Sequence, residues 1–62
     1  MMLQDEILTL LRSGGGAYLS GEAMSRKLGV SRAAVWKAVK ELQKQGHAVH
    51  SEAGRGYVLA GA

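Results

Sequence analysis

The sequence contains no cysteine, no proline and no phenylalanine. Without cysteine, disulfide bonds, thiolate metal ligands and a cysteine nucleophile are excluded. No apolar run approaches the length that spans a bilayer, and the first residues lack the charged and apolar segments of a signal peptide. The 62 residues, 47% of them hydrophobic, therefore predict one small soluble domain over 1–62 in the cytoplasm, with too little core to enclose an active site.

The positive charges are concentrated in the middle of the chain. Between Arg26 and Lys44 six cations accompany a single acid, Glu41, whereas the rest of the chain has two cations and four acids. The middle segment carries a net charge of +5 and the remainder −2, which together make the formal +3 of the chain. Such a segment is typical of a surface that contacts nucleic-acid phosphates, but a solvated lysine-rich helix face has the same charge pattern.

The spacing of apolar residues predicts a helix over about 2–12. Its apolar positions recur at helical intervals, and they are Leu3, Ile7, Leu8 and Leu11. The glycines at 14–16 end this helix, because a run of glycines loses too much backbone entropy to continue it. After them, Tyr18 and Leu19 are expected to form a short extended piece and to contribute to the core.

Two further helices and a hairpin are predicted in the second part of the chain. Ser20 and Ser31 are the expected N-caps of the helices, and Gly29 and Gly46 are the residues expected to end them. Alternating apolar and polar residues then predict a β-hairpin. The expected fold class is mainly α (α+β), three helices with a C-terminal two-stranded hairpin. The ranges are about 21–28 and 32–45 for the helices and about 47–60 for the hairpin.

The connection between the second and third helices has the length of a helix-turn-helix turn. Leu28-Gly29-Val30-Ser31 supplies a short turn with glycine, and such a turn joins two helices so that the second can lie in the DNA major groove. Ser25 is small, as a close crossing of the two helices requires. Short glycine-linked helix pairs also occur in ordinary helical bundles, so the turn alone does not decide between the two.

The third helix has one apolar face and one basic face. Its core side is predicted to consist of Val35, Ala38, Val39 and Leu42, and its opposite face of Ala33, Lys37, Lys40 and Lys44, with Trp36 at the edge. A helix with a small residue near its start and lysines behind it can enter a groove closely and then meet phosphates. The alternative is a simple amphipathic helix with a solvated lysine face. Trp36 is expected either to contact a sugar or a thymine methyl group or to pack under the hairpin.

The hairpin tip and the two histidines are the remaining features of the sequence with a bearing on function. A hairpin appended to three helices is a wing, and a cation at its tip, Arg55, can reach the minor groove or the flanking backbone. His47 and His50, three apart on a predicted strand, face opposite sides and have no cysteine or acid cluster beside them. No metal site and no catalytic residue are therefore expected.

Three stretches resemble one family of bacterial regulators. Ser20-Gly21-Glu22, the run from Leu28 to Lys37 and the run from Gly54 to Leu59 resemble the N-terminal winged helix-turn-helix domain of the biotin operon repressor, the bifunctional biotin–protein ligase. The resemblance implies sequence-specific binding of double-stranded DNA by the operator-reading module of a repressor of biotin biosynthesis or uptake genes. By matching position it assigns the operator-facing side to Ser31, Arg32, Ala33, Trp36, Lys37 and Lys40, and the wing tip to Arg55.

The resemblance also bears on cofactor, partner and assembly. In the family a ligase domain binds biotinyl-adenylate and dimerises, and these 62 residues lack the ligase sequence. No cofactor and no enzyme activity are therefore expected of this chain, whose partner would be an operator half-site and which would be a monomer on its own. Ala53 stands where the family often has proline, which predicts a more mobile wing tip. The alternative function is a winged-helix module that binds another protein without DNA specificity.

Overall fold

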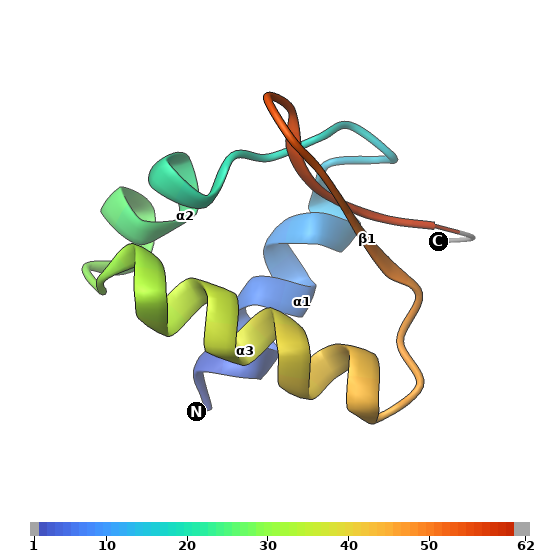
Figure 1. Cartoon of the computed structure of the whole chain (residues 1–62), viewed down its shortest axis with the longest axis horizontal. Coiled ribbons are helices and arrows are strands. Elements are labelled where there is room, and N and C mark those ends of the chain that lie inside the picture. The colour runs from blue at the N-terminus through green and yellow to red at the C-terminus, as the bar shows by residue number, and fades with distance from the viewer. Residues whose placement is uncertain (1, 61–62) are drawn as a thin grey trace.

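Three helices and an antiparallel hairpin follow one another in the predicted order (Figure 1). The structure is a computed structural model that describes residues 2–60. Met1 and residues 61–62, which the predicted domain includes, lie outside the described residues. The mainly α class with a two-stranded hairpin is confirmed, and the elements are α1 (Leu3–Ser13), α2 (Gly21–Leu28), α3 (Arg32–Lys44), β1 (Val49–Glu52) and β2 (Gly56–Leu59).

Local side-chain caps and one glycine determine where α2 and α3 begin and how they are joined. The Oγ atom of Ser20 accepts a hydrogen bond of 3.0 Å from the Ala23 N–H, and that of Ser31 accepts one of 3.1 Å from the Ala34 N–H. Gly29 adopts the left-handed conformation (φ 69°, ψ 34°) that closes α2. Both N-caps and the glycine C-cap are as predicted, and α3 therefore starts only three residues after this glycine.

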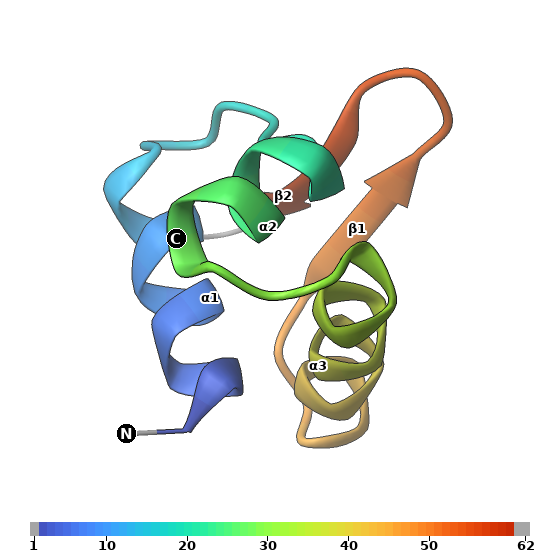
Figure 2. The ribbon, with the colours of Figure 1, turned by 90° about the vertical axis from the view of Figure 1, so that its left-hand side faces the viewer.

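The helices pack their apolar faces around one core. α3 packs against both α1 and α2, and α2 lies across one end of the pair formed by α1 and α3 (Figure 2). The predicted core face of α3 is buried, and so is that of α1 except for Leu3, which is partly buried. The first strand pair, Val49 opposite Leu59, is buried beside them. The full core consists of Ile7, Leu8, Leu11, Met24, Val35, Ala38, Val39, Leu42, Val49 and Leu59.

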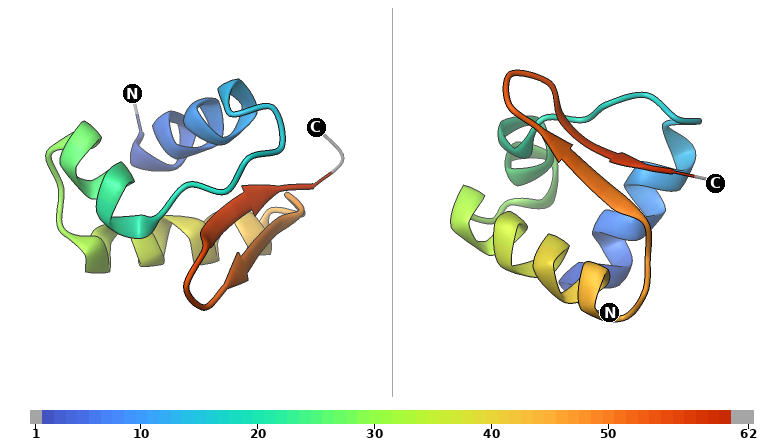
Figure 3. Two further views of the ribbon diagram at one scale, coloured as in Figure 1. Left: turned by 90° about the horizontal axis from the view of Figure 1, so that it is seen from above. Right: turned by 45° about the vertical axis from the view of Figure 1, so that its right-hand side comes forward.

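The segment before α2 is joined to the hairpin by its backbone. The Leu19 N–H donates to the Tyr57 carbonyl, and the Tyr57 N–H donates to the Leu19 carbonyl, both at 2.8 Å. This segment therefore runs beside β2 on the edge that β1 leaves free (Figure 3). The close approach is possible because Gly56 has no side chain and adopts φ 110°.

Two predictions about single residues are wrong. Tyr18 does not contribute to the core, since 36% of its surface is exposed, whereas its neighbour Leu19 packs against the core as expected. Successive residues of an extended segment point to opposite sides, so only one of the pair can face inward. His47 lies before β1 rather than on a strand, so the two histidines do not share the strand assumed for them.

Candidate nucleic-acid interface

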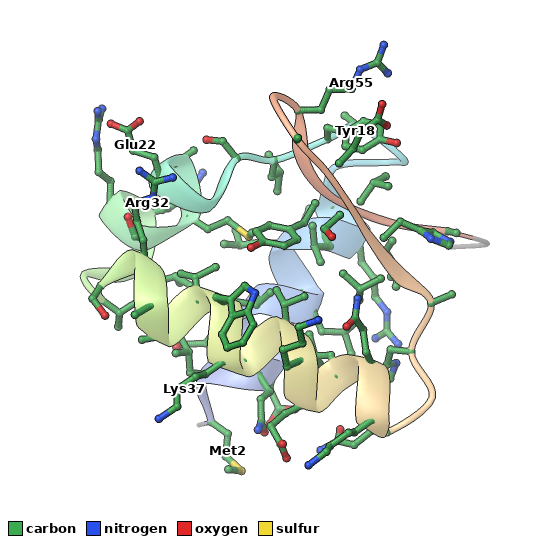
Figure 4. All side chains as sticks on the ribbon, in the orientation of Figure 1. Met2, Tyr18, Glu22, Arg32, Lys37 and Arg55 are labelled. Carbon is green, nitrogen blue, oxygen red and sulfur yellow. The ribbon has the colours of Figure 1, made fainter. Side chains whose placement is uncertain are left out.

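The basic face of α3 is fully on the surface. Its core face is buried, and the residues predicted for contact with DNA are all exposed: Arg32, Ala33, Trp36, Lys37, Lys40 and Lys44. In Figure 4, Lys37 extends from α3 into solvent, whereas Arg32 points from the start of α3 toward Glu22 on α2. This separation follows from the 3.6-residue period of the helix, which brings every third or fourth residue to the same side.

A groove lies between the first turns of α3 and the hairpin. It has a volume of about 630 Å³, and the start of α2 forms one end of it. Four of the predicted residues line this groove: Arg32, Ala33, Trp36 and Arg55. The structure thus brings together, on one concave surface, residues from α3 and from the hairpin that are more than 18 positions apart in the sequence.

The three lysines of α3 lie outside this groove. Lys37 lies on the side of α3 that faces the start of α1, beside Met2 and Leu3. Lys44 is at the far end of α3, about 18 Å along the helix from Arg32 at 1.5 Å per residue, and is 3.7 Å from Glu41 in an exposed ion pair. Such a pair contributes little to stability and leaves the ammonium group accessible.

Trp36 does not belong to the hydrophobic core, but its side chain contacts other residues of the protein. It is 53% exposed, and its other side lines the groove beside the hairpin. The Nζ atom of Lys40 lies 5.4 Å from the centre of its ring. A lysine at this distance over an indole makes a cation–π contact, and the rest of the ring remains open to a ligand in the groove.

The side-chain oxygen of Ser31 accepts a hydrogen bond within the protein. Because that oxygen accepts the Ala34 N–H, only the hydroxyl hydrogen and the other free amides of the first turn of α3 can be donated to a phosphate. Ser31 is exposed, but it does not line the groove.

The tip of the hairpin contains a contact that the sequence does not reveal. The Tyr18 hydroxyl donates to Glu52 Oε2 at 3.0 Å, and the Arg55 guanidinium carbon lies 5.5 Å from the centre of the Tyr18 ring. Figure 4 shows Tyr18 beside Arg55 at the tip. The hydrogen bond to the carboxylate of Glu52 is the main cause that raises the pKa of Tyr18; desolvation adds to it and the charge of Arg55 opposes it.

Sequence reasoning also missed two carboxylates. Glu22, paired with Arg26 on α2, and Glu52 both line the groove, together with the cations Arg32 and Arg55. No local pattern could have shown this, because these four charged residues come from α2, α3 and the hairpin, which are separate in the sequence. Among residues 2–60 no group of three histidine or acidic side chains is placed to hold a metal ion. None of the described helices is long and apolar enough to cross a membrane.

Taken together, the short turn between α2 and α3, the exposed face of α3 and the hairpin beside it define a winged helix-turn-helix module. Residues 3–58 match the HTH domain family, and the chain belongs to that family.

Two curated relatives share the name bifunctional ligase/repressor BirA, one from Bacillus subtilis and one from Bacillus spizizenii. The chain is 39% identical to each over 57 residues. The alignment covers 92% of the chain but only 18% of each relative. The resemblance to the biotin operon repressor, first seen in the motifs, is thereby confirmed, and the chain spans less than a fifth of these relatives' length.

Proposed function

We propose that this chain binds double-stranded DNA sequence-specifically, as the operator-reading module of a transcriptional repressor. The observation that carries the proposal is the one-sided α3: its apolar face is buried, and its exposed face continues through a groove to the hairpin. A helix of this kind fits the major groove, while the wing tip reaches the flanking backbone or the minor groove.

The roles of the residues follow from their chemistry. Ala33 and Trp36 are apolar and exposed near the start of α3, where they would meet base edges and thymine methyl groups. Ser31, Arg32 and Lys37 would contact phosphates at either side of the major groove. Further phosphate contacts would come from Lys40 and Lys44 along α3 and from Arg55 at the wing tip.

The relatives support a more specific role in gene regulation. Both are named bifunctional ligase/repressor, and together with the resemblance of the motifs to the biotin operon repressor this favours biotin biosynthesis or uptake genes as the targets of this chain. We assign no catalytic step to these residues, and biotinyl-adenylate would bind a ligase domain outside the aligned region. We further propose that 1–62 is a single cytoplasmic domain, monomeric by itself and paired on the operator when attached to a dimerising domain.

The proposal is tested by an NMR titration with two duplexes. One is selected by the chain from a random duplex library, and the other has the same base composition in scrambled order. We expect amide shifts in residues 31–44 and 54–57, stronger for the selected duplex and persisting at moderate salt. Equal shifts that vanish with salt would leave only a generic basic surface. The absence of any shift at low salt would favour a module that binds another protein.

A further inference from the structure

The wing-tip cation is held by a side chain from outside the hairpin. Arg55 belongs to the turn between β1 and β2, whereas Tyr18 belongs to the segment before α2. The ring of Tyr18 lies under the guanidinium group at 5.5 Å, and its hydroxyl donates to Glu52, three residues before Arg55, at 3.0 Å. A single exposed tyrosine thus contacts both ends of the turn.

The backbone keeps this tyrosine in place. The next residue, Leu19, exchanges two hydrogen bonds of 2.8 Å with Tyr57, and its side chain packs against the core. Since Leu19 faces inward in an extended segment, Tyr18 must face outward, over the turn of the hairpin. The backbone position of Tyr18 is therefore determined by the packing of Leu19 and its hydrogen bonds to Tyr57, and not by the turn that the ring contacts.

We propose that Tyr18 is a positioning residue that holds the Arg55 guanidinium at the wing tip for contact with a DNA phosphate, an inference that rests on the proposed function. A free arginine side chain loses rotamer freedom when it binds a phosphate, and this loss weakens binding. Arg55, held over a fixed ring by the cation–π contact, has already lost part of that freedom.

The contact with Tyr18 leaves N–H donors of the arginine available for a phosphate. The guanidinium carbon lies 5.5 Å from the centre of the ring, and the group has five N–H donors, more than one tyrosine can occupy. Those donors can form the two parallel hydrogen bonds that arginine makes with a phosphate. Glu52 contributes by fixing the Tyr18 hydroxyl, because the hydrogen bond restricts rotation of the ring away from the turn.

The first part of the test needs no DNA. In an NMR spectrum of the whole chain, the side-chain protons of Arg55 should be shifted upfield by the ring of Tyr18. The shift should be kept in Tyr18→Phe, which retains the ring, and lost in Tyr18→Leu. Arg55 protons that do not respond to Tyr18→Leu would overturn the proposal even if the chain binds DNA.

The second part is a double-mutant cycle on DNA affinity. The probe is a mixed-sequence duplex of about 20 base pairs, two turns of B-DNA, because phosphate contacts are independent of sequence. Tyr18→Leu should weaken binding about two- to fivefold, which corresponds to an exposed cation–π contact, and Tyr18→Phe should weaken it less. In the Arg55→Ala background, Tyr18→Leu should have no further effect.

Two outcomes of the cycle would overturn the positioning role. An equal loss on Tyr18→Leu with and without Arg55 would show that the tyrosine acts through general stability, and tighter binding of Tyr18→Leu would show that it sequesters Arg55. Arg12→Ala on α1 removes the same charge away from the groove and serves as the matched control for Arg55→Ala. A wild-type chain that does not bind the duplex at low salt would refute the proposed function itself, and the inference with it.

Discussion

Replacing Gly56 by alanine should separate the wing from the rest of the domain. Gly56 has φ 110°, and a Cβ atom at this position would overlap the carbonyl oxygen of Leu19 and lie 2.7 Å from Ser20 Cα. These are backbone atoms, so no side-chain rotation can relieve the overlap. The chain must move apart at the point where Leu19 and Tyr57 exchange their two hydrogen bonds.

The expected cost of this substitution is about 3–5 kcal/mol. A non-glycine residue in such a backbone conformation costs about 1–3 kcal/mol, and each of the two lost hydrogen bonds costs about 1 kcal/mol. A domain of this size is stable by roughly 3–9 kcal/mol in total. Gly56→Ala should therefore remove much of the stability of the fold or leave it folded with a detached wing.

Urea unfolding followed by circular dichroism, with amide hydrogen exchange at Leu19 and Tyr57, measures both effects. Gly54→Ala is the matched control, because Gly54 also has a positive φ (83°) but has no atom within 4 Å of the added Cβ. The free energy of unfolding of the control should fall only by the conformational cost of the positive φ, about 1–3 kcal/mol. If both variants lose the same free energy of unfolding and keep their protected amides, the reasoning is refuted: Gly56 is then not required for the contact between the wing and the segment before α2.

Three further results are expected. Lys37→Ala should lower the salt dependence of DNA affinity by about 0.9 in slope, the value for one lost phosphate contact, whereas Lys27→Ala on α2 should not; equal slopes in both variants would contradict the assignment. Ser31→Ala should lower the free energy of unfolding in urea by about 1 kcal/mol through loss of the N-cap, and an unchanged midpoint would argue against that cap. Tyr18 should ionise above the ordinary tyrosine pKa of about 10, and Glu52→Gln should lower its pKa in a titration followed by tyrosinate absorbance, since the hydrogen bond to the carboxylate is the main cause of the shift. Because the folded chain favours the protonated form, this contribution to stability is present below about pH 10 and is lost as the pH rises through the raised pKa; a pKa that does not respond to Glu52→Gln would contradict the hydrogen bond.

The fold could be predicted where its causes are local in the sequence. Ser20 and Ser31 cap the helices that follow them through atoms only three residues away. Gly29 turns the chain by its own backbone conformation, and the apolar period of α3 identifies its buried face without knowledge of what covers it. Each of these features depends on neighbours along the chain, so the pattern contains the information.

The candidate site could be predicted only in part. The exposed face of α3 follows from its periodicity, and Arg55 at the tip follows from the turn between two strands. For Tyr18 the sequence predicts a place in the core, and this prediction fails. The actual contacts of Tyr18 are 34 and 37 positions away in the sequence and leave no local pattern. The groove that joins α3 to the wing is likewise formed by elements that meet only in the folded chain.

The order of the elements, their caps and the charged side of α3 can be derived from the sequence, because these features depend on hydrogen bonds and periodicities within a few residues. The pairing of Leu19 with Tyr57, the need for glycine at position 56 and the contact of Tyr18 with Arg55 become visible only in the folded chain. The physical reason is the distance along the chain between the partners: which edge of the hairpin the segment before α2 joins depends on how the three helices pack around the core.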